Sequence, residues 1–208
     1  MLGLRVTVPI ACFRKALARE YLETEVLPPP ATCYGFLLSL VGETERRRHI
    51  GVRVTAGLLE HSEISTVLRT VWRVKSLPLG AGGNTRPDYQ QLLTQVELVV
   101  WLDAGKDSAT PNLEQRVGTA LDVPERIDRF GGLSFGESTH LVDEVTRLVP
   151  DDRRKVATFL LRERGRMTLP VWVDHVGSRN TRYVTGDLCE CPLAPPAIDE
   201  MPQIQPLD

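Results

Sequence analysis

The chain has 208 residues, of which 42% are hydrophobic and 25% are charged, and its formal net charge at pH 7 is −2. This composition is typical of a soluble globular protein with a real core, and it argues against a disordered chain. No apolar run approaches the ~20 residues that span a bilayer, and no signal-peptide cleavage site is present, so we expect a cytoplasmic protein without a membrane partner. The four cysteines have neither disulfide-framework nor zinc-site spacing, which predicts reduced thiols and no metal or other cofactor.

The charge is unevenly distributed along the chain. Residues 187–208 hold five acidic residues and no Lys or Arg, so the rest of the chain has 25 basic against 22 acidic residues and carries +3. Short basic clusters occur at residues 14–19, 46–48, 153–155, 162–166 and 179–182. Such clusters suit phosphate contacts, although any one of them is more often solvated surface. The distribution therefore permits nucleic-acid binding without requiring it.

The first part of the chain predicts a strand, a helix and a strand. Residues 2–10 and 49–59 are rich in β-branched residues and partly alternate, as strands do. Three prolines precede a helix predicted over residues 31–43, which ends at Gly42, a residue that accepts the left-handed conformation. The nearly all-apolar surface of this helix, with Gly35 allowing close approach, predicts tight packing against a sheet.

A projecting arm is expected next. Residues 63–75 and 89–105 both have strand character, and a Gly/Pro/Asn-rich loop separates them. The excursion over about residues 60–95 therefore predicts a β-hairpin thumb rather than a structureless loop.

A second helix and a glycine-rich turn follow. Thr110 and Pro111 predict the N-cap and first residue of a helix that Pro124 ends. Residues 129–138 form the glycine-rich turn, and residues 139–149 are predicted to be a strand.

The order β-α-β, arm, β-α-β indicates an α+β, ferredoxin-like (RRM-like) βαββαβ domain over residues 1–148. A small C-terminal β extension is expected over residues 149–186, containing a short helix or turn and a hairpin. A Pro-rich acidic tail follows over residues 187–208, and its part from residue 191 to 208 is expected to be extended and mobile. No RNP-like motif surrounds Trp101, which disfavours a plain RRM.

The glycine-rich turn is a candidate phosphate site. Gly131, Gly132 and Gly136 can bring backbone N–H groups close to a phosphate, with Ser134 and Ser138 as further donors. The same glycines can simply make a turn, and spacing alone favours that simpler interpretation. The segment matches neither a P-loop nor GxGxxG.

Catalytic residues are not evident. The four histidines are scattered, and His175 beside Asp174 lies where neighbouring strand residues face opposite sides. Metal-independent RNA cleavage can use His, Tyr and Lys for proton transfer. The set Tyr21, Lys15 and His175 has no support from spacing, so we expect that the protein is not an enzyme.

Three segments stand out together, in this order: FRKALAREYLETEVLPPPATCYGFLLSLVGE (13–43), RPDYQQLLTQVELVVWL (86–102) and GGLSFGESTHLVDEV (131–145). They resemble the CRISPR-associated protein 5 family of the RAMP superfamily, in its Myxococcus-type, type I-B-like form. The first is specific and the other two are weak alone. The likeness covers residues 1–148.

The resemblance implies a non-catalytic subunit that caps the 5′ repeat-derived handle of CRISPR RNA in a type I Cascade complex. It also implies contacts with the backbone filament subunit, the large subunit and, through the complex, target DNA. The handle contacts of the family map onto Arg14, Lys15, Arg19, Arg69, Arg73, Lys75, Gly132, Ser134, Gly136 and Ser138. We add Arg179 and Asn180 as further contacts and Tyr21 and Phe135 as residues that can stack on bases.

Two alternatives remain. One branch of the family processes CRISPR RNA, which makes a metal-independent endoribonuclease the main alternative. A protein–protein adaptor without an RNA role is the other, suggested by the modest net charge and the acidic tail. Defence and transposon-guided insertion both stay open as outcomes of RNA-guided DNA targeting.

Overall fold

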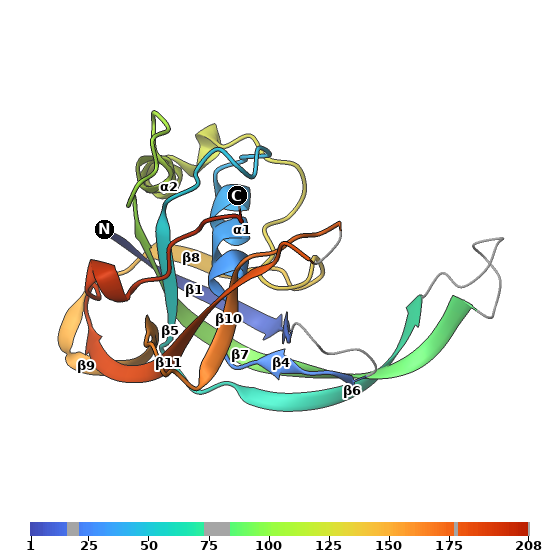
Figure 1. Ribbon diagram of the computed structural model, residues 1–208. Helices are drawn as coiled ribbons and strands as arrows, with labels where there is room; N and C mark the ends of the chain where they lie inside the picture. Colours follow the sequence, from blue (N-terminus) through green and yellow to red (C-terminus); the bar gives the residue numbers. More distant parts are fainter. Residues whose placement is uncertain (16–20, 73–83, 177–178, 208) are drawn as a thin grey trace.

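The computed structural model describes residues 1–15, 21–72, 84–176 and 179–207 (Figure 1). The helices of these residues are α1 (Pro30–Leu40), α2 (Leu113–Asp122) and the short 3-10 helices η2 (Pro124–Arg126) and η3 (Ile198–Glu200). The strands are β1 (Leu2–Ala11), β2 (Phe13–Arg14), β3 (Tyr21–Leu22), β4 (Thr24–Glu25), β5 (Arg53–Leu58), β6 (Glu63–Trp72), β7 (Thr85–Asp103), β8 (Glu144–Arg147), β9 (Asp151–Leu161), β10 (Met167–Trp172) and β11 (Arg182–Leu193).

The strands form one large sheet and one small one. The nine-stranded sheet has the order β10-β11-β9-β5-β7-β1-β8, and β3 and β6 also pair with β7. Its pairs are antiparallel except β3 with β7, and β2 pairs with β4 in the small sheet. A mostly antiparallel sheet combined with two α-helices in the described residues agrees with the predicted α+β class.

Both faces of the central strands are covered. Along β1, Leu4 and Val6 are fully buried and point into the main core, beneath α1. Because successive side chains of a strand face opposite sides, β7 serves two clusters: Leu98 joins the main core, whereas Val99 and Trp101 join a second cluster. The sheet is therefore the middle layer of the molecule.

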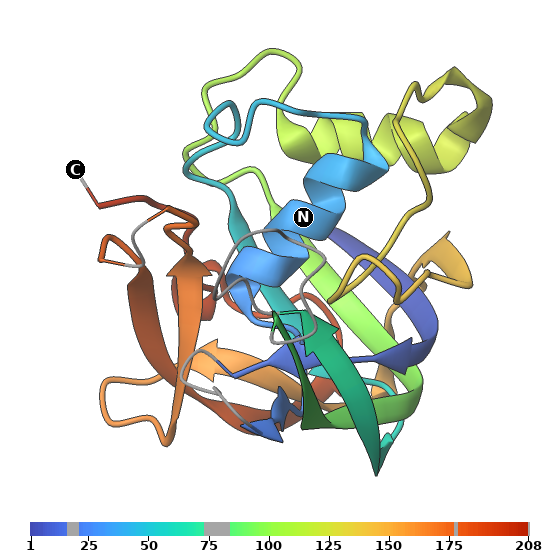
Figure 2. The same ribbon diagram turned by 90° about the vertical axis from the view of Figure 1, so that its right-hand side faces the viewer.

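Helix α1 lies across one face of the sheet, and α2 lies near the C-terminal end of α1 (Figure 2). Tyr34 and Leu37 are buried in the main core. The predicted end of α1 is confirmed, since Gly42 follows the C-cap with φ +65°. Gly35 does not mediate close packing as expected: it is exposed, and an added Cβ would have nothing within 4 Å. None of the described helices has the length and apolar character needed to cross a membrane.

Helix α2 begins later than the sequence suggested. Asn112, rather than Thr110, is the N-cap, and the helix starts at Leu113 instead of Pro111. The Asn112 side chain accepts a hydrogen bond from the Gln115 backbone N–H at 2.9 Å, and the Gln115 side chain accepts one from the Asn112 N–H at 3.1 Å. This capping box satisfies two donors of the first turn, which explains the shift.

The arm consists of β6 and the first half of β7, and it extends away from the body in Figure 1. The pairing runs without a register shift from Glu63↔Thr94 to Trp72↔Thr85. The second half of β7 pairs with β1 and β5 in the body. One 19-residue strand thus connects the arm to the central sheet.

The region after residue 149 extends the same sheet. It begins with β9, which occupies residues 151–161, pairs with β11, and also pairs with β5 at Gly57↔Thr158 and Leu58↔Ala157. The expected short helix or turn is a turn at residues 163–164, between β9 and β10. The predicted hairpin corresponds to β10 and β11.

The C-terminal segment packs against the body, although we expected residues 191–208 to be extended and mobile. Met201 and Ile204 are fully buried. The Ile204 N–H donates to the Val52 carbonyl at 2.8 Å, and the Gly51 N–H donates to the Ile204 carbonyl at 2.9 Å. Apolar residues spaced between prolines cover part of the sheet that the helices leave open, and this burial explains why the segment is held.

Candidate nucleic-acid interface

The glycine-rich loop, residues 131–140, is fixed to the end of β1 by a buried histidine. His140 Nδ1 accepts hydrogen bonds from the Cys12 N–H at 3.1 Å and from the Glu137 N–H at 3.3 Å. Burial lowers the pKa of His140, which keeps the ring neutral and its Nδ1 free to accept. The loop therefore lies directly beside the segment that follows the first strand.

Phe135 is a second anchor of the loop, and its predicted role in base stacking is wrong. Its side chain is 0% exposed. The ring stacks on Phe36 with centroids 4.4 Å apart and meets Phe13 edge-on at 5.6 Å. A ring enclosed in this way cannot reach a nucleotide, so Phe135 instead holds the loop to the core.

The next residue brings the loop backbone close to the chain after β1. Gly136 has φ +106°, and an added Cβ would lie 2.8 Å from the Cys12 carbonyl oxygen. Only glycine fits this position without strain. Of the other predicted loop residues, Gly132 and Ser138 are exposed and Ser134 is half-buried.

The arm is bonded to the same loop. Arg69 donates to Glu137 Oε2 at 3.0 Å, and Gln90 Nε2 donates to Glu137 Oε1 at 2.9 Å. Arg69 also donates to Gln90, so its guanidinium already has two protein partners while its side chain remains 43% exposed. Arg73 and Lys75, the other predicted arm contacts, lie outside the described residues.

The basic pair after β1 occupies the adjoining small sheet. Arg14 ends β2 opposite Thr24 of β4, and its side chain is exposed. Lys15 Nζ lies 3.8 Å from Glu23 Oε1, with 42% of the Lys15 side chain exposed. Arg19 falls outside the described residues.

An exposed row of rings and apolar side chains crosses the arm. Tyr21 of β3 is paired with Tyr89 of β7, which is paired with Leu68 of β6. Their side chains are 42%, 57% and 63% exposed, respectively. The Tyr21 hydroxyl lies 3.1 Å from its donor Gln91 Nε2 and 3.4 Å from Thr66 Oγ1, which fixes the ring. This row is a flat surface on which bases can stack.

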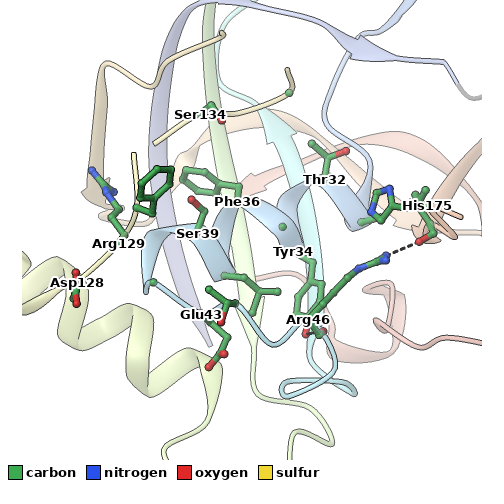
Figure 3. Close-up of a pocket in the computed structure, with 18 residues that line it drawn as sticks. Thr32, Tyr34, Phe36, Ser39, Glu43, Arg46, Asp128, Arg129, Ser134 and His175 are labelled. Carbon is green, nitrogen blue, oxygen red and sulfur yellow. Dashed lines mark hydrogen bonds between the residues drawn. The ribbon is translucent and has the colours of Figure 1, made fainter. Parts of the chain in front are cut away.

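A groove of about 760 Å³ runs between the exposed side of α1 and the glycine-rich loop (Figure 3). Its lining includes Thr32, Gly35 and Ser39 of α1, Ser134 and Gly136 of the loop, and Arg46, Arg129 and His175. Arg46 is held in place because its guanidinium lies 3.9 Å from the Trp172 ring centroid and donates to the Val173 carbonyl at 2.7 Å. The groove gives the loop a second accessible side.

Arg179 and Asn180 lie in the turn between β10 and β11, and both are exposed. The Asn180 N–H donates to Asp174 Oδ2 at 3.3 Å. His175, at the start of this turn, lines the groove. The turn is therefore placed beside the groove, whereas the contacts that join β1, the arm and the loop involve other residues.

The described residues contain one His–Asp pair at hydrogen-bond distance, but it is inaccessible. His49 Nδ1 lies 2.7 Å from Asp107 Oδ2, and both side chains are 0% exposed. His49 Nε2 faces the Arg116 guanidinium at 3.0 Å, so no ring nitrogen is open to a substrate. Within the described part of the chain, no group of three or more His, Cys, Asp or Glu side chains is arranged to hold a metal ion.

Sequence reasoning did not single out several residues that build the site. His140 and Glu137 follow the predicted loop glycines, and Gln90 and Tyr89 belong to the predicted arm, but nothing in their spacing marks them. Their roles depend on pairing between distant segments. The signal that was available is the proximity of His140 and Glu137 in sequence to Gly136.

Comparison with solved structures shows where the same fold occurs. A chain of a CRISPR RNA-guided surveillance complex superposes with a TM-score of 0.61 at 16% identity, covering 92% of this chain and 89% of that chain. A Cas protein seen in a crystal structure superposes with a TM-score of 0.54 at 13% identity, covering 97% of each chain. The fold is therefore one found among CRISPR-associated proteins.

The sequence defines the family more narrowly. The CRISPR-associated protein Cas5 of Myxococcus xanthus (strain DK1622) is 52% identical over 209 residues, which cover 98% of this chain and 97% of that protein. This chain belongs to the CRISPR-associated protein Cas5 family, which confirms the resemblance seen in its sequence. No protein-family model matches the chain.

Proposed function

We propose that the chain is a non-catalytic subunit of a type I CRISPR effector complex and that it binds and caps the 5′ repeat-derived handle of CRISPR RNA. The observation that carries the proposal is the convergence of three segments that are distant in sequence. The His140–Cys12 bond joins the loop to the chain after β1, and the Arg69–Glu137 bond joins the arm to the loop. Membership of the Cas5 family supports the same function.

The chemistry of the converging segments suits a single-stranded RNA. Arg14 and Lys15 supply positive charge, and the exposed backbone and hydroxyl of the loop supply neutral phosphate donors. Tyr21 and Tyr89 supply rings for unstacked bases. We assign the handle to this surface, with its phosphates towards β2 and the loop and its bases towards the exposed row.

The proposed architecture is the ferredoxin-like βαββαβ arrangement. Support comes from the strand order β8-β1-β7-β5, with α1 between β1 and β5 and α2 between β7 and β8. The proposed partners are the backbone filament subunit, the large subunit and, through the complex, target DNA, for defence or for guided insertion.

The test compares two double variants with equal loss of charge. Arg14→Ala with Lys15→Ala should weaken binding of handle RNA, and each lost phosphate contact should reduce the log–log salt slope by about 0.7. The control, Arg153→Ala with Lys155→Ala, removes two exposed basic residues from β9 and should leave the slope unchanged. Fluorescence anisotropy over a salt series measures both. Equal slopes for the two variants and the unmodified protein would contradict the site.

A second assay addresses the endoribonuclease alternative. Incubating the protein with repeat RNA in EDTA should leave the RNA intact, because no accessible proton-transfer set has been found in the described residues. Discrete 5′-handle products would refute a non-catalytic role.

A further inference from the structure

The arm has a long free edge. Strand β6 is ten residues long, and within the described chain it pairs with β7 alone. Its outer edge carries no backbone hydrogen bond among the described residues, and every residue from 63 to 70 is exposed. An edge of this kind presents a row of unpaired N–H and C=O groups to other chains.

The strands at the two ends of the main strand order, β8 and β10, are protected in the usual ways. Strand β8 has only four residues, which limits what can pair with it. Strand β10 contains Pro170 and a register shift between Pro170 and Trp172. Short strands, prolines and bulges are the devices by which proteins prevent pairing at an edge. Strand β6 has none of them, since it lacks proline and pairs with β7 without a shift.

The chemistry of β6 favours a protein strand over RNA as the occupant. Glu63 and Arg69 are its only charged residues, and they cancel. Arg69 is also bonded to Glu137. Ile64 and Leu68 are 53% and 63% exposed on one face, and Val67 is 37% exposed on the other. A neutral edge with regularly spaced amides and apolar side chains matches an extended peptide, whose backbone offers N–H and C=O groups at the same spacing. The RNA backbone has no N–H groups to donate to the carbonyls of the edge.

We propose that β6 receives an extended segment of another protein subunit, which adds to the arm as a fourth strand after β3, β7 and β6. The segment is uncharged over the paired residues and carries β-branched or aromatic side chains beside Ile64 and Leu68. Backbone hydrogen bonds supply most of the affinity, and these side chains set the register. The inference rests on the proposed place of the chain in an effector complex, but it does not require that the chain bind RNA.

Hydrogen–deuterium exchange tests the occupant. Successive N–H groups of a strand point to opposite edges, so about five of the ten β6 amides face outward. In the complete effector complex, purified through a tag on another subunit, these amides should exchange at least about tenfold more slowly than in the isolated chain. Unchanged exchange in the complex would overturn the proposal. Slowing by handle RNA alone would assign the edge to RNA, and slowing that grows with the concentration of the isolated chain would assign it to a second copy.

Two proline variants test the edge independently. Ile64→Pro and Ser65→Pro remove neighbouring N–H groups, of which one faces β7 and the other faces outward. The variant that keeps the melting temperature of the unmodified protein is the outward one, because proline is tolerated where the N–H faces solvent. That variant should enter the complex at least about tenfold less well while binding handle RNA normally. Normal incorporation would refute strand addition.

The two proposals fail in distinguishable ways. Loss of handle binding in the Arg14 and Lys15 variants bears only on the RNA site. Protection of β6 bears only on the added strand. If neither proline variant folds, the exchange experiment alone decides.

Discussion

Substitutions at Phe135 distinguish a role in the hydrophobic core from a role in base stacking. The side chain is fully buried between Phe36 and Phe13. Truncation of a buried Phe to Ala costs about 3–5 kcal/mol, of which each aromatic contact accounts for roughly 0.5–1.5 kcal/mol. Since a domain of this size has about 5–15 kcal/mol of stability, Phe135→Ala should lower the urea midpoint steeply. Tryptophan fluorescence during urea unfolding measures the loss.

The decisive variant is Phe135→Leu, which keeps a large apolar side chain but loses both aromatic contacts. It should cost about 1–3 kcal/mol of stability and leave the affinity for handle RNA unchanged. A base-stacking aromatic would instead lose about 1–3 kcal/mol of binding, or roughly 5- to 150-fold in Kd. A folded Phe135→Leu protein with such a loss of affinity would refute the assignment of Phe135 to the core.

Two further predictions concern the loop. Gly136→Ala should destabilise the loop by about 1–3 kcal/mol, because φ +106° is strained for alanine and its Cβ would crowd a backbone carbonyl. As a control in α1, Gly35→Ala at an open helical position should raise the melting temperature slightly. His140 should make the free energy of unfolding depend on pH. Burial lowers the pKa of His140 in the folded protein, so the unfolded chain binds the proton more readily. The stability that is present above pH ~6.5 is therefore lost as the pH falls below that value. The melting temperature should therefore fall between pH 7.5 and about 5.5, and His140→Gln should flatten this fall. A substitution at exposed His61 should leave the fall unchanged. An equal fall in the His140 variant would contradict the reasoning.

Local patterns predicted the elements of the body well. Alternation in β1 marks which of its residues enter the core, and the prolines and Gly42 delimit α1. These features depend on residues close together in sequence, whose conformational preferences act within a turn or a strand. The start of α2 was misplaced because Thr110, Pro111 and Asn112 all carry helix-start signals, and the Gln115 side chain decides between them.

The candidate site was predicted in outline but not in its contacts. Residue types predicted a glycine-rich turn, and Gly136 does adopt a positive φ there, against the Cys12 carbonyl; the predicted phosphate contact stays a prediction. They did not reveal that Phe135 turns inward or that Glu137 already binds Arg69. Whether a loop side chain faces solvent or the core depends on partners such as Phe13, which lie more than a hundred positions away. No local pattern encodes that choice.

The docked C-terminal segment has a consequence for how the protein is made. Met201 packs with Trp101 in the second core cluster, and Ile204 is hydrogen-bonded to Val52. Synthesis proceeds from the N-terminus, so β1 and β7 emerge from the ribosome long before the residues that cover them. The nascent chain must therefore wait for residue 204 to emerge with part of its apolar surface uncovered, and a chaperone has its best opportunity to act during that interval.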